Sequence, residues 1–246
     1  MRAMMRRMFL CFVILVLSST LSAAKPGPVV FTLMERFEGH SDTPSSIRDV
    51  SGETYAYTML SLFRKLDEDV FGNIFYINKL SLDDGETAGN IGGISVTKKH
   101  SKHLSMNYSY SYTSNPERNV VPSSDTDRFS IAANYTINPN TMSAPSYSIL
   151  TTYSTGTDFS YGRTIAEKFT VKDKFSKKSD YAVAYQYVYG LNNSEQFTNQ
   201  YSLDLNFNIT KLDRISFGYL FIDNIYSGAA YDDNIVRLSY YRTIKQ

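Results

Sequence analysis

The chain has few side chains suited to catalysis, because its only histidines are His40, His100 and His103. Ser105 follows His103 at a spacing of two, which in an extended strand places both side chains on one face, where an imidazole can activate a hydroxyl as a nucleophile. Asn107 lies on the same predicted face, in a position to orient the imidazole. Any histidine and serine on the polar side of a strand give this pattern, so we expect a polar surface and no enzyme.

The patterns that bind metals or cofactors are incomplete in this sequence. His100 and His103 have no third ligand nearby, whereas a zinc site takes three or four protein ligands. The glycine-rich segment 89–93 is not followed by the Lys-Ser or Lys-Thr of a phosphate-binding loop, and glycines inside a strand are typical of bends. We therefore expect no cofactor and no metal site.

The first 24 residues have the three parts of a secretory signal peptide. Basic residues precede a short apolar run over 8–17, and small residues end at Ala24. This order is typical of export by the general secretory route. We predict cleavage after Ala24, which leaves residues 25–246 as the mature protein and removes Cys11, the only cysteine.

The composition excludes several classes of protein. Lys and Arg number 25 against 24 Asp and Glu, a balance that argues against a nucleic-acid partner. The mature chain has no run of 18 apolar residues, so it predicts no membrane helix. The full chain contains 20 Tyr and 15 Phe with a mean hydropathy of −0.29. Many aromatics in a hydrophilic chain fit a β-barrel, where one face of each strand meets lipid.

Hydrophobic residues alternate with polar ones at a period of two, which is the signature of strands. In residues 103–113, Leu, Met and Tyr alternate with Ser and Asn, and residues 128–137 and 197–209 repeat the pattern. Tyrosines gather towards strand ends, as in the aromatic girdles of membrane barrels. A soluble β-sandwich also alternates, but it does not need a tyrosine-rich stripe on nearly every strand.

The whole pattern predicts an all-β fold, a closed antiparallel transmembrane barrel with an up-and-down meander. Twelve candidate strands can be counted, and an even number is typical of such barrels. The first four are the least certain in register. The predicted strands are 29–38, 53–65, 71–82, 88–98, 103–113, 128–137, 146–155, 159–175, 180–189, 197–209, 214–222 and 234–244.

The connections support an orientation with the N-terminus in the periplasm. Periplasmic turns are then short, and three of the outer connections, 39–52, 114–127 and 223–233, are the longest in the chain. Short turns inside and longer loops outside are the expected asymmetry.

In this pattern the chain resembles a Gram-negative outer-membrane, porin-like barrel of about twelve strands. In size and strand number it is similar to the small barrels that pass acidic oligosaccharides. The likeness covers nearly all of the mature sequence but includes no family motif. The last residues, Tyr240 to Gln246, also lack the terminal Phe or Trp with which such barrels usually close. The resemblance implies an outer-membrane location, with lipid, lipopolysaccharide and the barrel-assembly machinery as partners.

The inward faces of the clearest strands carry Ser, Thr, Asn and Gln, a lining that suits water. Strand parity also assigns Arg36, Arg128, Asp204 and Arg237 to the lumen as candidate pore-lining residues. Arginines at a constriction favour anions, and Asp204 opposes them. We therefore predict a passive channel for small hydrophilic solutes, anionic ones or oligosaccharides among them, with a mild preference for anions.

Other functions remain open at this stage. The arginines would bind lipopolysaccharide phosphates at the rim if the register were shifted by one residue. The barrel would be a non-conducting anchor if its lumen were closed, or the exit barrel of a polymer-export machine. An outer-membrane lipid hydrolase using His103 and Ser105 is the least supported of the alternatives. The sequence does not determine the oligomeric state.

Overall fold

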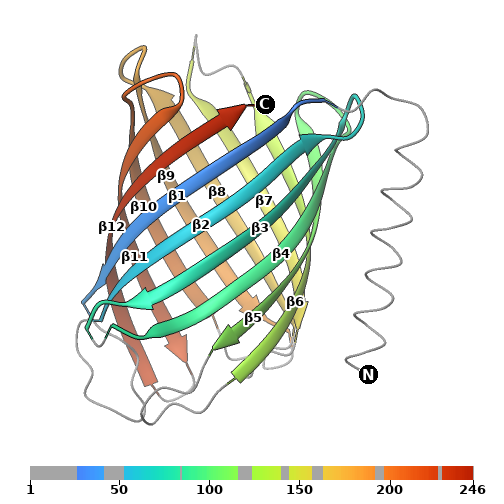
Figure 1. The fold of residues 1–246 in the computed structure, drawn as a ribbon. Coiled ribbons are helices and arrows are strands. Elements are labelled where there is room, and N and C mark those ends of the chain that lie inside the picture. The colour runs from blue at the N-terminus through green and yellow to red at the C-terminus, as the bar shows by residue number, and fades with distance from the viewer. Residues whose placement is uncertain are drawn as a thin grey trace.

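The described residues form twelve strands that close into a single antiparallel barrel (Figure 1). A computed structural model describes residues 27–41, 53–83, 85–115, 124–139, 144–156, 163–191, 197–226 and 229–245. The predicted signal peptide lies outside them. The strands are β1 (Val29–His40), β2 (Thr54–Lys65), β3 (Val70–Ser81), β4 (Thr87–Lys99), β5 (Leu104–Asn115), β6 (Ser124–Ile137), β7 (Ser146–Gly156), β8 (Arg163–Lys174), β9 (Ser179–Gly190), β10 (Phe197–Asn208), β11 (Asp213–Tyr226) and β12 (Ala229–Lys245).

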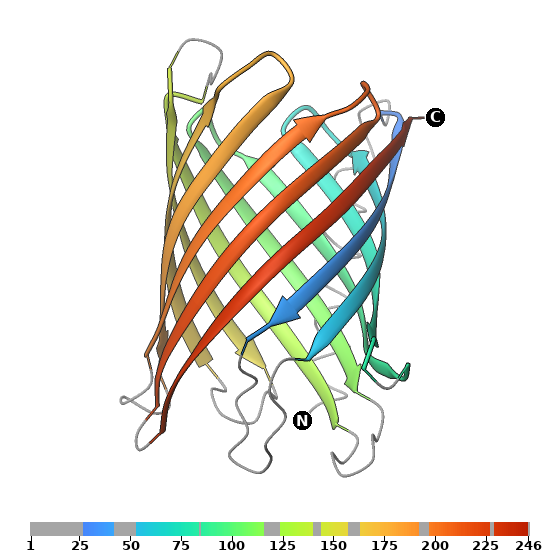
Figure 2. The same cartoon turned by 90° about the vertical axis from the view of Figure 1, so that its left-hand side faces the viewer.

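Each strand pairs with the strands before and after it in the chain, and the first pairs with the last. The ladder between β1 and β12 runs from Val30 opposite Lys245 to His40 opposite Ile235. This closing pair leaves no open sheet edge. The contact is visible where β12 lies beside β1 (Figure 2). The predicted strand count and meander are confirmed.

The two ends of the barrel differ. We call the end that holds the turns between β2 and β3, β4 and β5, β8 and β9, and β10 and β11 the turn end, and the opposite end the loop end. The C-terminus lies at the turn end, at the top of Figure 1. At this end Asn138, with a φ of 48°, donates from its side chain to the Pro145 carbonyl at 3.1 Å. In the described part of the chain, no helix is long and apolar enough to cross a membrane.

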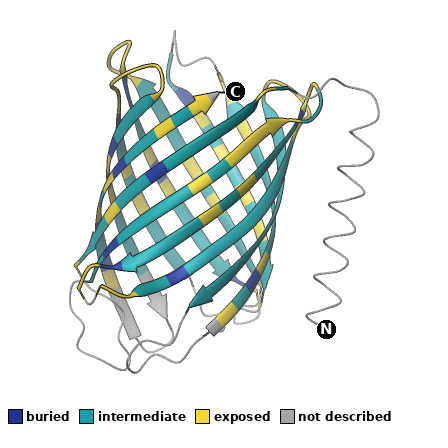
Figure 3. Ribbon diagram, viewed as in Figure 1, coloured by how far each residue is buried: buried dark blue, intermediate teal, exposed yellow. Residues whose placement is uncertain are grey.

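Alternation gives each strand one outward and one inward row of side chains. The outward rows expose large apolar residues such as Phe37, Ile74 and Phe217, and the exposed fraction reaches 63% at Val236. Few side chains are fully buried, and most strand positions are half-exposed on one face or the other (Figure 3). An apolar surface of this extent requires lipid around it.

Outward tyrosines are anchored to polar residues of a neighbouring strand in the loop-end half of the barrel. Tyr76 donates to Asn90 at 2.6 Å, and Tyr185 donates to Asn199 at 2.9 Å. Tyr110 likewise donates to Asp127 at 2.5 Å. A ring in lipid with its hydroxyl bonded to a polar group fits the membrane boundary. These bonds form one side of an aromatic girdle.

The predicted outer loop 223–233 is wrong. β11 and β12 continue to pair as far as Tyr226 opposite Ala229. Asp, Asn and Gly in this stretch resemble a loop, but a ladder is made by backbone groups and tolerates polar side chains where a strand extends beyond the apolar band. Part of the predicted strand 159–175 falls outside the described residues, which resume at Arg163.

Candidate functional site

The inner face of the barrel has three parts that differ in chemistry. The first, which we call the charged seam, follows the inward rows of β1 and β12 and reaches β10 at Asp204. It comprises Arg36, Glu38, His40, Asp204, Asp233, Arg237, Ser239 and Tyr241. The second, the polar wall, is the inward row of β6 to β10. The third, the aromatic wall, comprises Tyr55, Tyr57, Phe63, Phe71 and Phe75 on β2 and β3. Each follows from strand parity and register.

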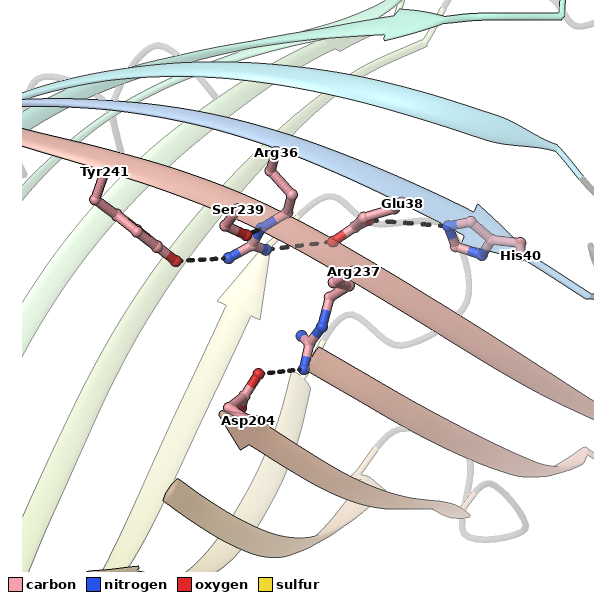
Figure 4. A network of polar contacts seen from close by, with 7 residues as sticks. All are labelled: Arg36, Glu38, His40, Asp204, Arg237, Ser239 and Tyr241. Atoms are coloured by element: carbon pink, nitrogen blue, oxygen red, sulfur yellow. Dashed lines mark hydrogen bonds and ion pairs between the residues drawn. The ribbon is translucent and has the colours of Figure 1, made fainter. Parts of the chain in front are cut away.

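The charged seam begins with Arg36, at the centre of a set of polar contacts (Figure 4). Its Nε donates to Ser239 Oγ at 3.0 Å and its Nη2 to Tyr241 OH at 3.3 Å, both across the β1–β12 closure. Its Nη1 lies 3.3 Å from Glu38 Oε1, two residues along the same strand face. The guanidinium is therefore held in place and its charge is partly compensated.

Towards the loop end the seam continues through His40. Its Nδ1 lies 2.7 Å from Asp233 Oδ2, and its Nε2 lies 3.8 Å from Glu38 Oε2. Tyr55 meets the imidazole edge-on, with ring centroids 5.5 Å apart. Opposite charges thus alternate along this line, which fixes the side chains and limits the net charge that a solute would meet.

Asp204 and Arg237 form an ion pair that spans a whole strand. Arg237 Nη2 lies 3.1 Å from Asp204 Oδ1, although β11 separates their strands. Gly218 on β11 is directly opposite both residues. A Cβ at Gly218 would lie 2.6 Å from Asp204 Oδ1 and 2.9 Å from Arg237 Nε. The missing side chain therefore provides the space in which the pair meets.

The structure places Arg36, Arg128, Asp204 and Arg237 in inward rows, but not as one ring. Because β12 is longer than predicted, Arg237 is near its middle rather than near its outer end. Arg36 faces Glu38, and Arg237 faces Asp204. Arg128 is separate and lies on the polar wall. The inward arginines therefore do not lie together at one constriction.

The polar wall encloses a cavity of about 550 Å³. Arg128, Lys168, Gln186 and Gln200 line it, together with serines and threonines of β6, β7, β8 and β10. A smaller cavity of about 100 Å³ continues from Lys168 to the Asp204–Arg237 pair. This side of the lumen offers charge and hydrogen bonds to a dissolved molecule.

The inner face carries more basic than acidic side chains in the described strands. The inward basic residues are Arg36, Lys65, Lys79, Lys99, Arg128, Lys168, Lys172, Lys174, Arg214 and Arg237, and the inward acidic residues are Glu38, Asp180, Asp204 and Asp233. The alternation of β8 alone would have placed its lysines in the lumen. The sequence analysis missed them because it considered only arginines as basic residues of the lumen. Lys172 lies 3.5 Å from Asp180.

The aromatic wall adds large apolar side chains to a lumen in which the clearest strands were expected to carry Ser, Thr, Asn and Gln. Tyr57 and Phe75 belong to inward rows, as do Met59 and Ile77 between them. The ring of Phe75 leans over β4, where a Cβ at Gly93 would meet its Cζ at 2.3 Å. In β2 both faces carry large apolar residues, so its inward face could not be assigned from alternation.

His103 and Ser105 do not form a catalytic pair. His103 lies in the turn before β5, its Nδ1 2.7 Å from the Thr136 carbonyl oxygen. Its ring is near that of Tyr135, an outward residue, with centroids 6.1 Å apart. Ser105 belongs to the inward row of β5. Because His103 is outside the strand, the alternation that would align the two side chains does not apply.

Comparison with known proteins identifies the fold and no family. No protein-family model matches the sequence, and no curated protein sequence is similar to it. Among solved structures, the COG4313 outer membrane channel from Pseudomonas putida F1 aligns with a TM-score of 0.60 at 8% identity, over 91% of this chain and 98% of that one.

Two further structures align over similar lengths. The NanC porin does so with a TM-score of 0.57 at 10% identity, over 85% of this chain and 98% of that one. A bacterial polysaccharide outer membrane secretin does so with a TM-score of 0.57 at 8% identity, over 87% and 98%. The chain therefore shares the barrel fold of outer-membrane porins and channels.

Proposed function

We propose that this protein is an outer-membrane channel through which small hydrophilic solutes diffuse passively, with a preference for anions. The observation that carries the proposal is the polar wall, where Arg128 and Lys168 line a cavity among glutamines, serines and threonines. Water fills a polar space of this size readily. In narrower barrels of about eight strands, the side chains themselves fill the interior.

The preference for anions follows from the inner charge balance. Asp204 and Glu38 compensate Arg237 and Arg36, whereas the cavity of the polar wall is lined by two basic side chains, Arg128 and Lys168, together with neutral ones. Basic side chains in a narrow aqueous path raise the local concentration of anions. The selectivity is therefore expected to depend on the polar wall more than on the charged seam.

The location and processing of the protein belong to the same proposal. The outward apolar surface and the shared fold support the outer membrane. Export through a signal peptide over residues 1–24 and contact with lipopolysaccharide and the assembly machinery would accompany that location.

The test is ion selectivity in planar bilayers with the purified barrel. Under a potassium chloride gradient, the reversal potential should indicate preference for chloride. Replacing Arg128 and Lys168 with glutamine should remove most of that preference, whereas Lys178→Gln in the turn between β8 and β9 should leave it unchanged. A channel that prefers potassium, or one that is indifferent to the double change, would contradict the assignment of anion selectivity to the polar wall.

A further inference from the structure

The aromatic wall has features that an ordinary aqueous pore does not need. It places large apolar side chains opposite water, which is unfavourable unless they bind something. Between the tyrosines and phenylalanines lie Met59 and Ile77, inward on β2 and β3. Phenylalanine and isoleucine side chains offer no hydrogen bond to a hydroxyl group, and the methionine thioether is only a weak acceptor.

At the turn end of the wall, two rings and an ammonium group form a compact unit. Phe63 and Phe71 are stacked, with ring centroids 5.5 Å apart and planes 16° from parallel. Lys99 Nζ lies 4.8 Å from the centroid of Phe71. No acidic residue is inward at this level in the described parts of β2, β3 and β4, where Asn73, Ser95 and Thr97 are the polar neighbours.

A similar unit lies at the loop end of the wall. Lys79 Nζ lies 3.4 Å from the centroid of Tyr55 and 5.7 Å from that of Tyr57. The two rings are 6.3 Å apart. The wall thus presents a ring-and-lysine unit at each end, with apolar side chains between.

From this arrangement we infer that the channel selects small aromatic carboxylates. A benzoate-like molecule matches the turn-end unit part for part, because its ring stacks on Phe71 and its carboxylate pairs with the ammonium group of Lys99. Along the stretch from Met59 to Phe75 the ring keeps apolar contacts, and the inward Ser61 within it is already hydrogen-bonded to Asn73. A sugar acid has the same charge, but its hydroxyl groups would lose hydrogen bonds along that stretch, which is costly.

The inference rests on the proposed function, since a molecule can be selected only if the barrel conducts. Its test is block of the chloride current by sodium benzoate, compared with sodium glucuronate, at neutral pH in planar bilayers. Benzoate should halve the current at a lower concentration than glucuronate does. Phe71→Leu keeps apolar volume and removes the ring, and it should raise the half-blocking concentration of benzoate roughly three- to tenfold.

Two other variants separate the parts of the site. Phe169→Leu makes the same change on the outward face of β8, and it should leave the block unchanged, which controls for folding. Lys99→Gln should weaken block by both anions, because it removes the ammonium that they share.

Equal block by benzoate and glucuronate, or no effect of Phe71→Leu, would overturn the inference and leave the channel standing. Absence of any chloride current would instead refute the proposed function.

Discussion

The ion pair between Asp204 and Arg237 gives a quantitative test of how the inner face controls selectivity. In Asp204→Asn the amide retains an oxygen that can accept from Arg237, whose partner atom lies 3.1 Å away. The side chain keeps its size next to Gly218, so the barrel should not change shape. The variant therefore removes one negative charge from the lumen and little else.

The size of the effect can be worked out from the charge. A unit charge about 7 Å from an ion changes its energy by about 0.6 kcal/mol at the dielectric constant of water. Screening over a Debye length of about 10 Å at 0.1 M salt lowers this to about 0.3 kcal/mol. The change favours an anion and disfavours a cation by that amount, so the permeability ratio should shift towards anions roughly two- to threefold.

The assay is the reversal potential of the variant and of the unchanged protein in the same salt gradient. Arg237→Gln should shift the ratio towards cations by a similar factor, and Glu68→Gln in the turn between β2 and β3 should have no effect. The shifts should shrink at 1 M salt, where the Debye length is about 3 Å. A shift towards cations in Asp204→Asn, or none at low salt, would refute the placement of this pair beside the ion path.

Two further predictions test the fold. Gly93→Ala should lower the free energy of unfolding by about 1–3 kcal/mol, because its Cβ would lie 2.8 Å from the backbone oxygen of Tyr110. Gly92→Ala is the control, because a Cβ there has nothing within 4 Å, and it should change the free energy of unfolding by less than about 0.5 kcal/mol. Urea unfolding in detergent compares the two variants. Leu82→Cys at the loop end should react with a membrane-impermeant maleimide on intact cells whereas Lys178→Cys at the turn end should not, and reversed labelling would invert the orientation.

The fold could be predicted from the sequence because alternation is a local signal. Residues 197–209 show it without reference to any other strand, and their neighbours repeat it. The closure of β1 on β12 then follows from strand count and parity. The predicted strand ends were wrong where strands extend past the apolar band, as in β11, because the polar residues there do not alternate with apolar ones.

The side-chain partners on the inner face could not be predicted in the same way. Parity placed Asp204 and Arg237 in the lumen, but their contact depends on the register of three strands and on Gly218 between them. A shift of one residue would turn either side chain to the other face. The aromatic wall was missed because β2 has apolar residues in both rows.

The central claim is that the barrel encloses a conducting, water-filled path. Single-channel recording on the purified, folded protein tests it most directly, with migration on unheated gels as the check that the barrel is closed. The polar wall predicts discrete current steps that scale with salt concentration and reverse at a potential set by anion preference. A folded barrel that inserts into the bilayer and passes no current would contradict the account.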